Sequence, residues 1–239
     1  MGRNLCLVLL SLVALAACSP EGPSAFVDIS VVPDSECIYR PGTGEGALFK
    51  PIGLYDIATD GDPDVTDRGL CENPYLVWLR VNSQLRPSYD MELGRSEPNV
   101  LQITRAEVRL MDQQQRTLVF DMVDPPLPNP FLVNTNLSLP PTDNEEPSVG
   151  VAAVEVIPTS YASSLSDLIN DQILAEIQFF GKTLGDVEVD IAPYLYPIRI
   201  CHRCLVRCAG SIDFEELEMD DECQDNAGYD GRLCIDESC

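Results

Sequence analysis

The chain has 239 residues, 39 of them acidic and 15 basic, and its formal net charge is −24 at pH 7. So acidic a surface repels nucleic acid and anionic lipid headgroups, which excludes both as expected partners. A hydrophobic fraction of 45% excludes a wholly disordered chain.

The first seventeen residues have the composition of an export signal. Arg3 and the amino terminus form a short positive region, and residues 5–17 are apolar apart from Ser11. A membrane-spanning helix needs about 20 apolar residues, so this run is too short to span and matches the hydrophobic region of a signal peptide. Residues 1–17 are therefore predicted to be a signal peptide.

The end of this leader, Leu15-Ala16-Ala17-Cys18, resembles the lipobox of bacterial lipoproteins. The resemblance implies cleavage before Cys18, a diacylglycerol on its sulfur and usually a third acyl chain such as palmitate. Two or more chains anchor a protein stably at a membrane. The alternative is Ala14-Leu15-Ala16, which fits an ordinary secretory cleavage site that would release a soluble protein.

The residues after Cys18 bear on where the anchor lies. Ser19 stands where many inner-membrane lipoproteins carry aspartate, which favours the outer membrane, on either its periplasmic or its surface face. Residues 18–24 are rich in Pro, Gly and Ser, a composition typical of flexible linkers. They are predicted to form the lipidated cysteine and a flexible tether.

The other cysteines agree with export, because an even number in an oxidising compartment predicts disulfides. Eight follow Cys18, predicting four bridges: Cys37, Cys71, Cys201, Cys204, Cys208, Cys223, Cys234 and Cys239. Cys37 and Cys71 are expected to pair with each other, with a bridge to the tail as the alternative. The six cysteines of the tail allow fifteen connectivities.

Residues 25–200 mostly follow the period of two that β-strands have. Ala106, Val108 and Leu110 alternate with charged residues, which predicts a strand with one wet face. Residues 75–81 are apolar on both faces, which predicts a central strand with Trp78 in the core. Further strands are predicted over 26–32, 117–123, 131–138, 151–157, 173–180, 187–191 and 194–200.

One helix interrupts this pattern and is predicted to begin after Thr159. Apolar residues there recur at helical spacing: Tyr161, Leu165, Leu168 and Ile169. Eight or nine short strands, proline-rich loops and one short helix predict a mainly β fold. The expected architecture is an antiparallel β-sandwich of immunoglobulin or fibronectin-III type, with a closed barrel as the alternative.

Residues 201–239 form a different, acidic and cysteine-rich tail that is too short to build a hydrophobic core. It is predicted to be a small disulfide-rich module. The spacing of Cys201 and Cys204 around His202 could also suit zinc or a redox pair, but an oxidising compartment favours disulfides. The whole layout resembles bacterial surface lipoproteins with a β-rich domain and a terminal cysteine cluster, a group without an activity that could be transferred.

An acidic loop is the one candidate for a metal site. Val65 stands where the calcium-binding EF-hand loop has glycine, and Cys71 stands where it has its last glutamate. A solvated acidic loop is therefore the favoured interpretation and a weak calcium site the alternative. The candidate ligands alternate along the loop: Asp60, Asp62, Asp64 and Asp67.

Catalysis has little support in the sequence. His202 is the single histidine and lies between cysteines, and the sequence lacks the common nucleophile, zinc, phosphate and dinucleotide motifs. We expect a non-enzymatic, lipid-anchored envelope protein with a binding or structural role, no cofactor, and an envelope protein or polysaccharide as partner. The alternatives are a calcium-dependent adhesion or ligand-binding module and, after it, a hydrolase that uses two carboxylates.

Overall fold

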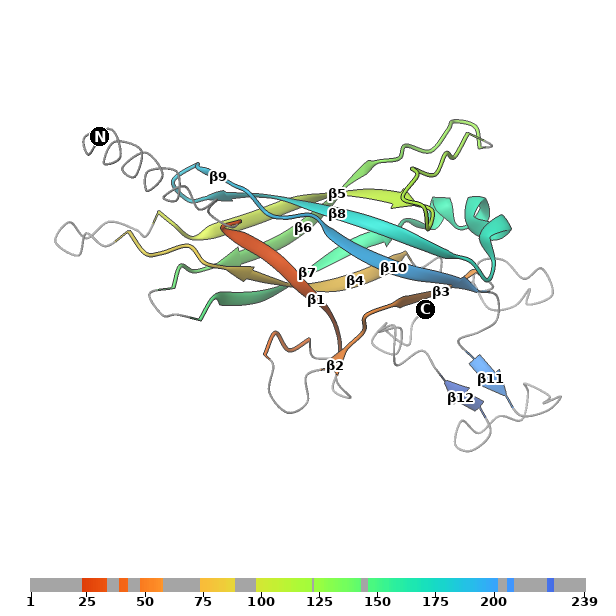
Figure 1. Ribbon diagram of the computed structural model, residues 1–239, viewed down its shortest axis with the longest axis horizontal. Helices are drawn as coiled ribbons and strands as arrows, with labels where there is room; N and C mark the ends of the chain where they lie inside the picture. Colours follow the sequence, from red (N-terminus) through yellow and green to blue (C-terminus); the bar gives the residue numbers. More distant parts are fainter. Residues whose placement is uncertain are drawn as a thin grey trace, which may run out of the picture.

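The computed structural model describes residues 23–33, 39–42, 48–57, 74–88, 98–121, 123–142, 146–201, 206–208 and 223–225. The described chain is mainly β, as its periodicity predicts. Its strands form a four-stranded sheet, a six-stranded sheet and a separate two-stranded pair (Figure 1).

The four-stranded sheet, sheet A, is antiparallel throughout. Its strands, in spatial order, are β2 (Leu48–Phe49), β1 (Ala25–Val32), β4 (Tyr75–Ser83) and β7 (Ser148–Ile157). The apolar run of β4 thus lies between two neighbours, which confirms the prediction of a central strand.

The position of Trp78 on β4 differs from the prediction. Val77, Leu79 and Val81 are buried on one face of the strand. Trp78 lies on the opposite face, where it is half-buried and stacks on Tyr39 with ring centroids 4.2 Å apart. The expectation of a core Trp78 is wrong because successive residues of a strand point to opposite faces.

The six-stranded sheet, sheet B, carries most of the candidate site. Its spatial order is β3 (Gly53–Asp56), β10 (Tyr194–Cys201), β8 (Gln172–Thr183), β5 (Leu101–Met111) and β6 (Phe131–Leu139), with β9 (Glu188–Val189) also on β8. β3 and β10 pair in parallel, whereas the other strand pairs are antiparallel. The predicted purely antiparallel arrangement is therefore wrong at this one pair. A parallel partner needs a long connection, and here most of the chain separates the two strands.

The two sheets share one hydrophobic core. Buried side chains of both sheets join in one cluster, for example Leu79, Val154, Leu110 and Ile177. At one margin, the Thr135 hydroxyl of β6 donates to the Ala153 carbonyl of β7 at 2.8 Å. At the other margin, Ala25 forms an isolated parallel bridge with Ile191.

The predicted helix is present as two 3-10 segments, η3 (Thr159–Tyr161) and η4 (Ser163–Leu168). Its hydrogen bonds join residues three apart, such as the Leu165 N–H and the Ala162 carbonyl at 3.1 Å. The residue before η3 is Pro158, which makes no side-chain cap. Tyr161 and Leu165 are buried, so the segment covers one end of the core.

The strand predicted over 117–123 is wrong. Residues 117 and 120 make only isolated bridges, to Met111 and Leu127. The Leu118 N–H does donate to the Leu110 carbonyl at 3.0 Å, but the side chain of Asn129 takes the neighbouring positions. It accepts from the Leu110 N–H at 2.9 Å and donates to the carbonyls of Leu110 and Leu118, each at 2.8 Å. A side-chain amide thus takes the place of part of the backbone ladder.

The long strands run between two ends of the molecule (Figure 1). At the first, the Ala25 end, β5 begins where β8 finishes, because Leu101 pairs with Thr183. At the second, the Cys201 end, Met111 pairs with Leu174 and β10 stops. The tail contributes β11 (Val206–Cys208) and β12 (Cys223–Asp225), in which Cys208 lies opposite Cys223.

Candidate functional site

The structure describes few of the residues that the sequence singles out. Outside the described residues lie Cys18, Cys37, Cys71, Cys204, Cys234, Cys239 and the loop with Asp60, Asp62, Asp64 and Asp67. Cys201 is buried and disulfide-bonded, with its sulfur 3.4 Å from the Tyr55 carbonyl oxygen. The full set of four disulfides stays a prediction.

Among the residues that the structure describes, no group of three or more His, Cys, Asp or Glu side chains could hold a metal ion. Within the same ranges, no helix has the length and apolar character needed to cross a membrane.

A hollow with room for a ligand lies in sheet B near the Ala25 end. Its volume is about 740 Å³, within the range of roughly 300–1,000 Å³ that small-molecule sites occupy. Its walls are Gln102, Thr104 and Arg105 of β5, residues 178–182 of β8, and the segment from Glu188 to Ile191. We call this feature the hollow.

Side-chain hydrogen bonds fix the wall that β9 contributes. Gln178 Nε2 donates to the Ile191 carbonyl at 2.6 Å and to the Phe179 carbonyl at 3.2 Å. Lys182 Nζ lies 3.0 Å from Asp186 Oδ1, and this hydrogen bond raises the pKa of Lys182. The segment is therefore tied to β8 at both its start and its end.

Arg105 and Phe180 face each other across β5 and β8. The guanidinium carbon of Arg105 lies 5.2 Å from the centre of the Phe180 ring, a cation–π contact. Phe180 remains 38% exposed. Within the described part of the chain, Arg105 makes no salt bridge, whereas Arg109 on the same strand pairs with Glu176 at 3.0 Å. Arg105 thus lines the hollow without a carboxylate partner among the described residues.

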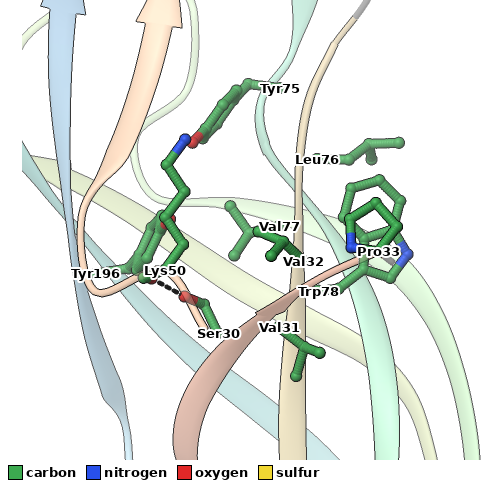
Figure 2. Close-up of a pocket in the computed structure, with 10 residues that line it drawn as sticks. All are labelled: Ser30, Val31, Val32, Pro33, Lys50, Tyr75, Leu76, Val77, Trp78 and Tyr196. Atoms are coloured by element: carbon green, nitrogen blue, oxygen red, sulfur yellow. Dashed lines mark hydrogen bonds between the residues drawn. The ribbon is translucent and has the colours of Figure 1, made fainter. Parts of the chain in front are cut away.

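A much smaller cavity lies between the sheets (Figure 2). Its volume is about 20 Å³, room for roughly one water molecule. The Ser30 hydroxyl donates to the Lys50 carbonyl there, and the Leu54 N–H donates to the Tyr75 hydroxyl at 3.2 Å. Figure 2 shows the Lys50 ammonium group turned toward Tyr75. This cavity is too small for a ligand larger than a water molecule.

Nearby on sheet A, Arg80 is fully engaged. It is 9% exposed, and its Nε donates to Asp28 Oδ1 at 2.9 Å. It also donates to the Pro41 carbonyl at 3.3 Å and lies 5.5 Å from the centre of the Phe49 ring. Burial acts to raise the pKa of Asp28, but hydrogen bonds and the positive charge of Arg80 outweigh it, so that pKa is lowered.

The Tyr39–Trp78 stack lies on the same face of sheet A. Burial alone raises the pKa of Tyr39 to about 12, so its hydroxyl stays protonated at neutral pH. With Arg80 paired and Trp78 covered, this face presents packed rather than available groups.

The chain matches no known protein family and no curated protein. Function is therefore inferred from the chemistry of the site.

Little in the sequence points to the hollow. Its residues come from three segments far apart along the chain, and Arg105 and Arg109 occupy equivalent positions in the alternating pattern. What separates the two arginines is the residue opposite each on β8, which is Phe180 for Arg105 and Glu176 for Arg109. The one detectable signal is Phe180, an apolar residue next to Phe179 that breaks the alternation of β8.

Proposed function

We propose that the protein is a lipid-anchored envelope protein that binds a polysaccharide in the hollow. The observation that carries this proposal is the hollow itself, where a guanidinium that has no carboxylate partner among the described residues lies over a partly exposed aromatic ring. Exposed aromatic rings and clustered polar groups fit a ligand that has both hydroxyl-rich edges and apolar faces.

The lining supplies the polar groups that such a ligand needs. Gln102 can donate and accept, Thr104 can do the same, and Glu188 accepts. Arg105 adds a planar set of donors suited to the carboxylate of an acidic sugar. A flat protein surface would instead bury a larger and more apolar area, so the concave shape favours polysaccharide over an envelope protein.

The binding proposal is tested with the full-length protein and purified envelope polysaccharides, both neutral and uronic-acid-containing. Arg105→Ala and Phe180→Ala should each weaken binding, by about 1–2 kcal/mol or five- to thirty-fold in Kd. Leu132→Ala is the matched control, since Leu132 is 61% exposed on β6 and does not line the hollow. Unchanged affinity in both hollow variants would reject the proposal, and release of reducing sugar would reassign the protein as a hydrolase.

The anchor is tested by growth with labelled palmitate. Label should be incorporated into the wild-type chain and lost in Cys18→Ala. Label that survives this substitution would contradict the lipobox, and a wild-type protein without label would favour ordinary secretion.

We further propose a β-sandwich of immunoglobulin or fibronectin-III type, with β3 as its one parallel strand. It is supported by inward side chains of both sheets that pack in one cluster.

A further inference from the structure

The turn between β8 and β9 exposes two aliphatic side chains. Leu184 is 52% and Val187 is 63% exposed. The turn is nevertheless firmly held. The Thr183 N–H donates to the Val187 carbonyl at 2.9 Å, and the N–H groups of Leu184 and Gly185 donate to the carbonyls of Val100 and Pro98 at 3.0 and 2.9 Å. We call residues 184–187 the apolar turn.

The chain leaves the fold toward this same turn. Ala25 and Ile191 form a parallel bridge, so residues that precede Ala25 run in the same direction as those that precede Ile191. The latter lead back through β9 to Val187. The Ser24 carbonyl accepts from the Gln84 N–H at 2.9 Å, which holds the departing chain in place.

The distance to the anchor is short. Cys18 and Ser24 bound seven residues, which span at most about 25 Å when fully extended. An acylated Cys18 therefore keeps the Ala25 end within about 25 Å of the bilayer, whereas the Cys201 end lies roughly 35 Å, the length of β5, from the Ala25 end.

We propose that the apolar turn contacts the lipid surface and orients the domain on it. This inference rests on the proposed lipid anchor. Leu184 and Val187 are the groups that insert, and a shallow contact suffices because the acyl chains already hold the protein there.

Charges near the turn specify the kind of lipid. The side chain of Asp186 is 84% exposed and pairs with Lys182, and Glu188 follows two residues later. These carboxylates repel anionic headgroups. The structure thus assigns the turn to a surface of zwitterionic lipid such as phosphatidylcholine or phosphatidylethanolamine.

The test uses the full-length lipidated protein in phosphatidylcholine vesicles whose acyl chains carry bromine, which quenches tryptophan fluorescence. Leu184→Trp and Val187→Trp should each be quenched. The native Trp78, which stacks on Tyr39 away from the turn, should not be. Val119→Trp is the matched control, because Val119 is 76% exposed but lies near the Cys201 end, after β5.

The outcomes separate the two proposals. Protein that fails to float with the vesicles overturns the anchor and, with it, this inference. Protein that floats without quenching of either turn variant, or with quenching of Val119→Trp instead, leaves the anchor in place and overturns the orientation.

The lipid class is tested separately. Vesicles of phosphatidylglycerol should reduce the quenching of Leu184→Trp, and adding Asp186→Asn should restore part of it. Equal quenching in both lipids would contradict the assigned lipid class.

Discussion

Each of the two sheets holds an arginine over a phenylalanine, but the two pairs differ in burial and in the partners of the guanidinium. Arg80 over Phe49 on sheet A is almost completely buried and is bound by Asp28 and the Pro41 carbonyl. Arg105 over Phe180 on sheet B is exposed and has no carboxylate partner in the described residues. The same contact therefore serves packing on one sheet and leaves a charged group available on the other.

A cation–π contact therefore does not by itself identify a binding site. What distinguishes the two pairs is whether a carboxylate already satisfies the guanidinium, and whether space remains beside the ring. Beside Arg105 there is a hollow of about 740 Å³, whereas near Arg80 the cavity is about 20 Å³.

The largest expected effect is on the buried pair. Arg80→Met leaves the carboxylate of Asp28 without its partner and should lower the free energy of unfolding by about 2–3 kcal/mol. Arg109→Met, which removes an exposed ion pair, should cost less than about 1 kcal/mol. Urea unfolding measures the loss of unfolding free energy in each variant. Similar losses would contradict the conclusion that Arg80 contributes more to stability than Arg109.

The next effect concerns how closely the junction in Figure 2 is packed. A Cβ atom on Gly53 would lie 2.3 Å from the Tyr75 hydroxyl oxygen and 2.8 Å from Tyr196 Cε1. Both rings are buried, so Gly53→Ala should destabilise by about 2 kcal/mol. Gly185→Ala is the control, since its Cβ would meet its nearest neighbour at 3.4 Å. Thermal unfolding should separate the two variants, and equal melting temperatures would mean that the junction has room to relax.

A smaller effect depends on pH. The pKa of Asp28 lies below 3.8 in the folded protein, so its ionised form stabilises the fold at higher pH. That contribution is lost as pH falls through the folded pKa. Because Asp28 is partly exposed, Asp28→Asn should destabilise by only about 1–2 kcal/mol at neutral pH. The gap to wild type, followed by urea unfolding across acidic pH, should close; a constant gap would contradict the role of this carboxylate.

The smallest effect on stability is expected at the exposed pair. Arg105→Ala and Phe180→Ala should each change the free energy of unfolding by less than about 1 kcal/mol. The same variants are expected to weaken polysaccharide binding, so stability and binding should both be measured on one protein sample. A loss of binding without a loss of stability would assign Arg105 and Phe180 to the site rather than to the packing. A loss of stability as large as that of Arg80→Met would place Arg105 in the packing as well.

The period of two predicted most strands correctly, because every second residue of a half-buried strand is apolar. The predicted segments at 75–81, 131–138 and 173–180 lie inside β4, β6 and β8. The prediction of a strand at 117–123 failed because the side chain of Asn129, eleven residues from Leu118, makes part of the hydrogen bonds of that segment. The alternation of apolar residues does not predict such a side-chain contact.

The candidate site could not be predicted from the sequence, for a related reason. Arg105 and Phe180 meet through the register of β5 against β8, and register depends on the whole sheet. The irregular step between Ile103 and Arg105 leaves Thr104 and Arg105 both exposed and moves the buried positions of β5 from odd to even residues. The parallel pairing of β3 was equally hidden, because it joins residues nearly 150 positions apart.

The opposite placement of Ala25 and Cys201 also determines how the domain would carry a mechanical load. A pull between a membrane-held Cys18 and a partner gripping the tail would act along β1 and β10 rather than across them. Each of these strands is hydrogen-bonded along its length to a neighbour, β1 to β4 and β10 to β8. Such bonds are strained together in shear instead of opening one after another, so the domain would resist extraction from the envelope by force.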